Sequence, residues 1–206
     1  MDDVAAVAAL DEPTRRLLYA HVARQPAPVS RDDVAAALRI PRATVAFHLD
    51  KLVAENLLAV TFERRTSRAG PGAGRPAKLY RRSDRQLAVT VPERHYELAA
   101  HLMAGALSTG TPLTVCARSA GAELANPGDD ARELLERHGF EPYPDGRDVA
   151  LRNCPFHDLA RAHPDLVCGM TLGLVSGMLF GAGSALVARP DPRPGHCCVR
   201  LSGSGC

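Results

Sequence analysis

Apolar residues recur at helical spacing in two neighbouring stretches of the chain, residues 30–39 and 41–53. Ser30 is in position to cap the first helix, with Asp33 three residues later as in a capping box. Pro41 disfavours helical geometry in the residue before it and therefore separates the two helices. The second helix has an apolar face made of Val45, Leu49, Leu52 and Val53. Two helices joined by so short a turn predict a helix-turn-helix.

The next segment, residues 58–82, predicts a hairpin with a long basic tip. Apolar and polar residues alternate at Leu58, Val60 and Phe62, give way to a Gly/Pro-rich loop, and resume at Leu79. The segment contains seven positive side chains and one negative side chain. A positive hairpin of this kind is typical of a wing that contacts phosphates or enters the minor groove. A plain helical hairpin in a core would show the same helix periodicity, so the basic wing is what favours DNA binding.

Positive charge is concentrated in the part of the chain that contains the predicted helix-turn-helix and wing. The 206 residues have a net charge of only +2, but residues 1–83 contain 14 positive and 9 negative side chains, and the remainder contains 11 and 14. Only Lys51 and Lys78 among the basic residues are lysines, and arginine suits both phosphate and guanine contacts. We predict base contacts from the second helix and phosphate contacts from the wing. The groove residues are Arg42, Thr44, Phe47, His48 and Lys51, and the phosphate-binding residues are Arg64, Arg65, Arg68 and Arg75.

A family resemblance supports this interpretation. The run TVAFHLDKLVAENLL at residues 44–58, followed by GRPAKLYRR at residues 74–82, resembles the winged helix-turn-helix of ArsR-like and SufR-like bacterial regulators. The resemblance covers roughly the first 83 residues. It implies a transcriptional regulator that binds a double-stranded DNA operator.

The rest of the chain predicts a mainly α fold with small α+β parts. Helices are expected at 93–107, 112–125, 129–138, 157–163 and 165–179, and strands at 140–144, 148–153, 185–189 and 197–201. We divide the chain into a winged helix-turn-helix domain (1–83), a helical linker or dimerisation region (84–128) and an α+β sensor domain (129–206). The Ala- and Gly-rich helices of the middle region could pack on their twins in a homodimer, as paired half-sites require, or could simply cover the sensor domain.

Five of the six cysteines lie in the last third of the chain, and the candidate ligands among them are Cys154, Cys168, Cys197 and Cys198. Thirteen residues separate the first two, and twenty-eight separate Cys168 from the adjacent pair. A turn, a helix and a returning strand could bring three of the sulfurs to one point. In a reducing cytosol such thiols serve for metal binding, redox chemistry or plain burial. The spacing is not the C-x2-C knuckle of structural zinc.

This part of the chain also resembles a known family. The run NCPFHDLARAHPDLVC with a late CCVRL is similar to the C-terminal domain of SufR-type regulators, which carry an iron–sulfur cluster on three cysteines and repress cluster-assembly genes. The resemblance implies a redox-sensing repressor with a [4Fe-4S] or [2Fe-2S] cluster on Cys154, Cys168 and either Cys197 or Cys198. Because adjacent thiols on a strand point to opposite faces, we expect only one of the pair to bind, with a preference for Cys198. The open candidates for a fourth ligand are His157, His163 and His196.

Other functions remain to be weighed. A second interpretation keeps the DNA-binding domain but has the C-terminal domain bind Zn(II) or a small apolar ligand in the Gly/Met-rich residues 169–180. We do not predict an enzyme. Cys154 with His157 is the best candidate for a nucleophile–base pair, and the sequence contains no phosphate-binding loop. The longest apolar run, residues 170–187, is interrupted by glycines, and the first residues are acidic. We therefore expect no membrane span and a cytoplasmic location.

Overall fold

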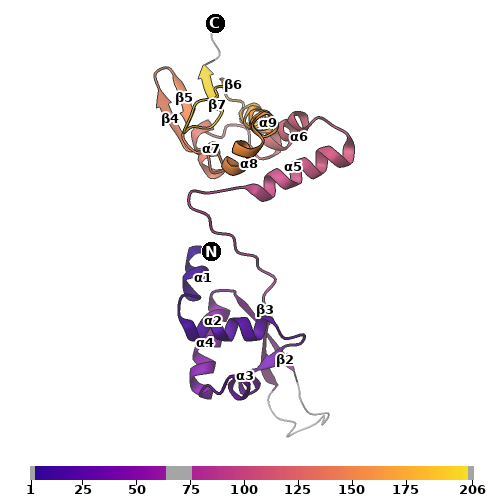
Figure 1. Cartoon of the computed structure of the whole chain (residues 1–206), viewed down its shortest axis with the longest axis vertical. Helices are drawn as coiled ribbons and strands as arrows, with labels where there is room; N and C mark the ends of the chain where they lie inside the picture. The colour runs from indigo at the N-terminus through magenta and orange to yellow at the C-terminus, as the bar shows by residue number, and fades with distance from the viewer. Residues whose placement is uncertain (1–2, 64–75, 204–206) are drawn as a thin grey trace. The chain divides into compact units, whose positions relative to one another are not determined.

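The computed structural model describes residues 3–63 and 76–203 (Figure 1). The chain divides into two compact units, Met1–Val89 and Thr90–Cys206, and each has its own hydrophobic core. The expected fold class is confirmed: a helical N-terminal unit with a small sheet precedes an α+β unit.

The first unit consists of helices around a short antiparallel sheet. Its elements are α1 (Asp3–Ala9), α2 (Pro13–Ala23), β1 (Val29–Ser30), α3 (Arg31–Leu38), α4 (Arg42–Ala54), β2 (Leu58–Glu63) and β3 (Ala77–Arg82). The strands lie in the order β1-β3-β2. The sequence did not predict α1 or β1, since the first is a short Ala-rich segment and the second has only two residues.

The helix ends in this unit follow from the sequence. Ser30 caps α3, and its capping box with Asp33 is formed as predicted. Arg39 ends this helix in the left-handed conformation, with a φ of 55°. The cap of α2 is Glu12, and its carboxylate accepts hydrogen bonds from the N–H groups of Thr14 and Arg15. The Ser30 cap and the left-handed Arg39 thus fix where α3 begins and ends, and so where the turn to α4 lies.

The second unit packs helices on a four-stranded antiparallel sheet of order β4-β5-β7-β6. Its elements are α5 (Tyr96–Thr109), α6 (Leu113–Glu123), α7 (Ala131–Arg137), β4 (Pro142–Asp145), β5 (Asp148–Leu151), α8 (His157–Ala162), α9 (Pro164–Ala182), β6 (Leu186–Pro190) and β7 (Val199–Gly203). Figure 1 shows α9 between the sheet and α6, with α5 outermost. One core includes residues of α5, α6, α9 and the sheet. Residues 84–128 therefore do not form the separate region that we expected, because both of their helices join the second unit.

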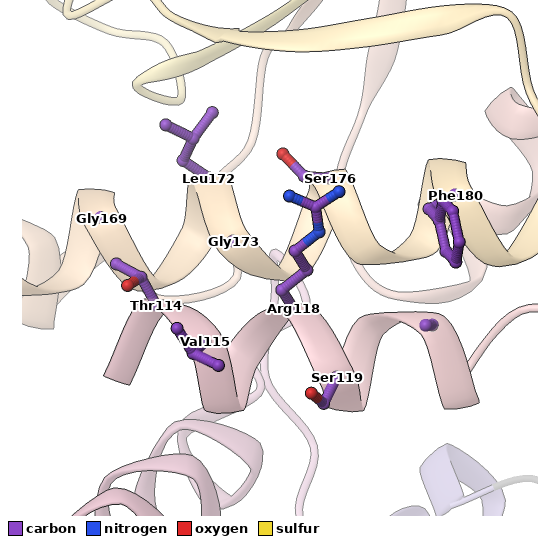
Figure 2. A pocket seen from close by; sticks show the side chains of 10 residues that line it. Thr114, Val115, Arg118, Ser119, Gly169, Leu172, Gly173, Ser176 and Phe180 are labelled. Atoms are coloured by element: carbon purple, nitrogen blue, oxygen red, sulfur yellow. The ribbon is translucent and has the colours of Figure 1, made fainter. Parts of the chain in front are cut away.

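Helices α6 and α9 are in very close contact, because glycines on α9 face the backbone of α6 (Figure 2). A Cβ atom added to Gly173 would lie 2.4 Å from the Thr114 carbonyl oxygen, and one added to Gly177 would lie 2.0 Å from that of Arg118. These distances are too short for any side chain larger than hydrogen. The Gly-rich pattern of residues 169–181 thus serves packing within the chain.

By length and composition alone, α9 could also cross a membrane. It has 19 residues without interruption, and its most apolar window has a mean hydropathy of 1.5. Half of that window is buried inside the protein, where Met170, Leu174 and Met178 form the centre of the core. Such burial is typical of the core helix of a folded unit.

Candidate cysteine pocket and nucleic-acid interface

Cys154, Cys168, Cys197 and Cys198 line one pocket of about 370 Å³. Cys154 follows β5, Cys168 lies in the first half of α9, and Cys197 and Cys198 directly precede β7. Of the three histidines considered as a fourth ligand, His157 and His196 also line this pocket, whereas His163 is not among its lining residues. The fold thus brings together thiols that lie as much as 44 positions apart.

The adjacent pair does not follow the geometry that the sequence suggested. We expected Cys197 and Cys198 to alternate along a strand, but β7 begins only at Val199. Both residues lie in the preceding turn, where the backbone N–H of Cys197 donates to the Leu151 carbonyl oxygen at 2.9 Å. The argument that strand alternation allows only one of them to bind therefore does not apply, since both line the pocket.

Hydrogen bonds connect the four sulfurs in a chain. The Cys197 thiol is within hydrogen-bond reach of the sulfurs of both Cys154 and Cys198 and can donate its one S–H to either, which raises the pKa of Cys197 well above its ordinary value. The same bonds lower the pKa of Cys154, and lower that of Cys198 to about 6, although burial opposes both shifts. Burial, with a hydrogen bond to Cys198, raises the pKa of Cys168 to about 12. The pocket thus favours a thiolate at Cys198, and a thiolate is the form of cysteine that binds metals.

Buried hydrogen bonds connect the Cys154 loop to the start of α5. The Asn153 side chain is buried, and its Nδ2 donates to the carbonyl oxygens of Gly139 (2.6 Å) and Glu93 (3.3 Å). Its Oδ1 accepts from the Arg94 guanidinium at 2.6 Å, and the backbone N–H of His95 donates to the Pro155 carbonyl oxygen at 3.1 Å. A displacement of Cys154 would therefore be transmitted to residues 93–95.

A second polar network holds the loop that carries Cys197 and Cys198. The Arg200 guanidinium binds the carboxylates of Asp145, Asp148 and Asp191, with a distance of 2.8 Å to Asp191. The backbone N–H of Asp191 in turn donates to the Cys198 carbonyl oxygen at 2.8 Å. This network ties one end of the loop to the sheet. Arg161 and Arg193 bring positive charge to the wall of the pocket.

The side chains around the thiols do not form a site for a single metal ion. Among the residues that the structure describes, no three or more His, Cys, Asp or Glu side chains are grouped so that they could hold one ion. Cys116 lies in α6 and is not among the residues that line the pocket, and Cys206 lies outside the described residues. The thiols surround a cavity instead of meeting at a point.

In the first unit, α4 presents an exposed face with Ala43, Phe47, Asp50, Lys51 and Ala54. Phe47 is 67% exposed, although it is a large apolar residue, and its small neighbours leave room for a close approach. The residues of α4 that face the core are Val45, Leu49 and Leu52, as the periodicity predicted. Exposed apolar surface beside basic residues suits the major groove, where thymine methyl groups line the floor.

The predicted groove residues differ in how they lie. The guanidinium of Arg42 is exposed and pairs with Asp32 of α3 at 2.5 Å, while Lys51 pairs with Glu55 at 2.7 Å. Thr44 is half-buried. His48 differs from the others, because its side chain is only 13% exposed and its Nδ1 lies 3.6 Å from a Glu12 carboxylate oxygen. His48 therefore has little surface to offer a base, and its contact is with the cap of α2.

The wing consists of β2 and β3, which pair from Leu58 opposite Arg82 to Glu63 opposite Ala77. The four predicted phosphate-binding arginines, Arg64, Arg65, Arg68 and Arg75, lie outside the described residues, and their contacts stay a prediction. Lys78 of β3 lies in the described part of the wing, and its ammonium group pairs with Asp50 of α4.

Comparison with known proteins agrees with this geometry. Residues 10–61 match a family described as a helix-turn-helix domain, which spans α2 to most of β2. The first unit contains a helix-turn-helix domain. Comparisons with curated proteins and with solved structures give no significant match. The helix-turn-helix domain supports a DNA-binding transcriptional regulator, fits an ArsR-like one, and points away from an enzyme.

Sequence reasoning missed two features of this helix-turn-helix protein. Asp50 was not among the predicted groove residues, yet it lies in the middle of the exposed face of α4. The helical spacing from Phe47 could have revealed it. Asn153 and Arg94 were also missed, and their hydrogen bond joins positions 59 apart in the chain. No local sequence signal could have indicated that contact.

Proposed function

We propose that this protein is a transcriptional repressor whose affinity for its DNA operator is controlled by an iron–sulfur cluster bound in the cysteine pocket. The observation that carries the proposal is the convergence of Cys154, Cys168, Cys197 and Cys198 on one pocket, in the same chain as a helix-turn-helix domain. Regulation of cluster-assembly genes is the target that the sequence resemblance implies. A regulator of this kind works in the cytoplasm, where thiols stay reduced.

The residues of the pocket fit such a cluster. Thiolates are the preferred ligands of iron–sulfur clusters, and four cysteines can bind either a [2Fe-2S] or a [4Fe-4S] centre. The four cysteines line a cavity of about 370 Å³, which has room for a cluster of several metal atoms. Arg161 would offset part of the negative charge of a cluster bound by thiolates, whereas Arg193 is already paired with Asp145 and Asp191. When bound, the cluster would supply a centre that responds to oxidants and to the supply of iron.

The chain itself provides a route from the pocket to the rest of the molecule. Cys154 is adjacent to Asn153, which is hydrogen-bonded to Arg94, and residues 90–95 are the segment through which the chain enters the second unit. The Tyr96 hydroxyl group adds a hydrogen bond to Asp158 of α8 at 2.9 Å. A change at the Cys154 thiolate would thus shift the start of α5. A coupling free energy of about 1–3 kcal/mol, or roughly 5- to 150-fold in affinity, would suffice for regulation.

The proposed repressor is a homodimer that pairs through α5. Only Ala99 and Leu102 of this apolar helix are buried, and Leu107 is 86% exposed. A groove of about 480 Å³, with Ala100 and Met103 in its wall, runs between α5 and α8. A second copy of the chain would cover this apolar surface and would present a second α4 to the next half-site, one helical turn or about 34–36 Å along the DNA.

A second candidate function has its own observation. A groove of about 490 Å³ lies over the contact between α6 and α9 (Figure 2), within the region considered for a small apolar ligand. Phe180 is 73% exposed beside it, and Val115 and Leu172 form part of its wall. Under this alternative, a small apolar molecule rather than a cluster would control DNA binding.

The deciding experiment is anaerobic purification and reconstitution of the full chain with iron and sulfide. We expect a brown protein with bound iron, acid-labile sulfide and visible absorption, and an affinity for its selected operator that differs between the holo and apo forms. Cys154→Ala should abolish bound iron and sulfide, whereas Cys116→Ala in α6 should retain both. Sedimentation of the same samples tests the dimer.

A colourless wild-type protein without iron or sulfide after reconstitution would refute the cluster. If apolar ligands then changed operator affinity, and Phe180→Ala removed that effect, the alternative function would take its place.

A further inference from the structure

The exposed face of α4 carries one acidic residue, Asp50. Its side chain is 57% exposed, and it lies one helical turn from Phe47 on the face that a helix-turn-helix presents to the major groove. A carboxylate at this position weakens the attraction to DNA phosphates. Its presence in the middle of a reading face therefore calls for a specific role.

Two donors from the wing fix the position of the carboxylate. The Lys78 ammonium group lies 2.5 Å from Oδ1, and the Tyr80 hydroxyl group donates to the same oxygen at 3.1 Å. The Tyr80 side chain is buried in the core of the first unit, so that its hydroxyl group is rigidly placed. The hydrogen bond from Lys78, aided by that from Tyr80, lowers the pKa of Asp50 and keeps it ionised.

This arrangement leaves the second oxygen available. Both wing donors bind Oδ1, and the described residues make no hydrogen bond to Oδ2. An ionised carboxylate can only accept hydrogen bonds. Asp50 thus presents an oriented acceptor on the exposed face of α4, and Lys78 offsets its charge.

We propose that Asp50 selects cytosine in the operator by accepting a hydrogen bond from its N4 amino group, with Lys78 and Tyr80 as positioning residues. Cytosine presents this donor in the major groove, whereas the acceptor atoms of guanine and thymine repel a carboxylate. Adenine has an amino donor as well, but its adjacent N7 is an acceptor. The inference rests on the proposed DNA-binding function and names the base that one residue reads.

The alternative is that Asp50 only links α4 to the wing. In that case its loss would weaken binding to every DNA sequence alike, because the wing would be less well placed. The two roles therefore differ in base preference, which can be measured directly.

The test is selection of binding sites from a random duplex library with the full-length protein and three variants. The variants are Asp50→Asn, Asp50→Ala and, as a control, Asp84→Asn. Asp84 lies beyond the end of β3, and its exposed carboxylate pairs with Arg81. Thermal unfolding of each variant confirms that it is folded.

We expect the wild-type protein and the Asp84→Asn control to select cytosine at one position of each half-site. Asp50→Asn should change that position to adenine, because an amide pairs with the N6 and N7 atoms of adenine. Asp50→Ala should lose the preference at that position alone, with a reduction of roughly 5- to 150-fold in discrimination, the range for one mismatched base pair.

The inference is overturned if both Asp50 variants select the wild-type sequence, whatever their affinity. It also fails if the wild-type protein selects a sequence without cytosine at any position affected by Asp50. Selection of no sequence at all by the wild-type protein would instead refute the proposed DNA-reading function, and the inference with it.

Discussion

The helix ends of the first unit and the cysteine pocket of the second depend on contacts of very different range along the chain. In the first unit, the helix-turn-helix is set by neighbours, as where Ser30 and Asp33 cap α3 and Arg39 ends it. In the second unit, the candidate site exists only because distant segments meet, as Cys154 meets Cys197 and Asn153 meets Arg94. Substitutions at the helix ends of the first unit should therefore have small, local effects, whereas substitutions at the distant contacts of the second unit should affect both stability and function.

The largest effect is expected where two distant helices touch. Gly177→Ala would place a Cβ atom 2.0 Å from the Arg118 carbonyl oxygen and 2.9 Å from the Ala122 nitrogen. Backbone atoms cannot move aside as a flexible side chain can, so α6 and α9 must separate. We expect the second unit to lose roughly 1–3 kcal/mol or more of its free energy of unfolding. Urea unfolding followed by residue-resolved hydrogen exchange measures this loss for each unit separately.

Gly105→Ala is the matched control for this substitution. Gly105 also lies inside a helix of the second unit, but a Cβ atom there would have no other atom within 4 Å. Removal of a glycine from a helix interior should stabilise the unit by about 0.5–1 kcal/mol. Equal destabilisation by both substitutions would contradict the packing argument, because the loss would then not depend on the contact between α6 and α9.

An intermediate effect is expected at the contact that joins the cysteine pocket to α5. Asn153→Ala removes the hydrogen bonds to Glu93, Arg94 and Gly139 and leaves buried polar groups without partners. We expect the bound iron to remain, because all four thiols are present. The ratio of holo to apo operator affinity should fall from the proposed range of roughly 5- to 150-fold towards one. Iron analysis together with operator titrations of both forms measures the two quantities.

Tyr143→Phe serves as the control for this prediction. It removes a hydrogen bond at the same pocket, from Tyr143 to the Nδ1 of His196 at 3.1 Å, but this bond has no connection to α5. The control should keep the wild-type affinity ratio. If Asn153→Ala kept the wild-type affinity ratio as well, the cysteine pocket would be coupled to DNA binding by another route. The contact between Asn153 and Arg94 would then have no role in regulation.

The same comparison explains how much could be predicted from the sequence. Helix periodicity, the capping box at Ser30 and the break at Pro41 located α3 and α4 almost to the residue, because each depends on positions a few residues apart. The tertiary contacts of individual side chains were not accessible in this way. The burial of His48 against Glu12 is an example, since the cap lies on another helix.

In the second unit the elements were predicted more accurately than their arrangement. The strand expected to begin at Cys197 begins two residues later, and this small shift places both adjacent cysteines at the pocket. The role of Gly173 and Gly177 in packing was not predicted, because it depends on the backbone of α6 passing alongside. The sequence suggests that the thiols lie together, but only the fold shows which thiols are neighbours.

The smallest effect is expected at the cap of α3. The Ser30 hydroxyl oxygen accepts a hydrogen bond from the Asp33 N–H at 3.2 Å, so Ser30→Ala should cost the first unit about 0.5–2 kcal/mol. Ser30→Thr keeps the hydroxyl group and should retain most of the stability. Hydrogen exchange should locate the loss in α3 and its neighbours, while exchange in the second unit stays unchanged. An equal loss of protection from exchange in residues 90–203 would mean that the two units unfold together. A local contact in the first unit would then stabilise the whole chain.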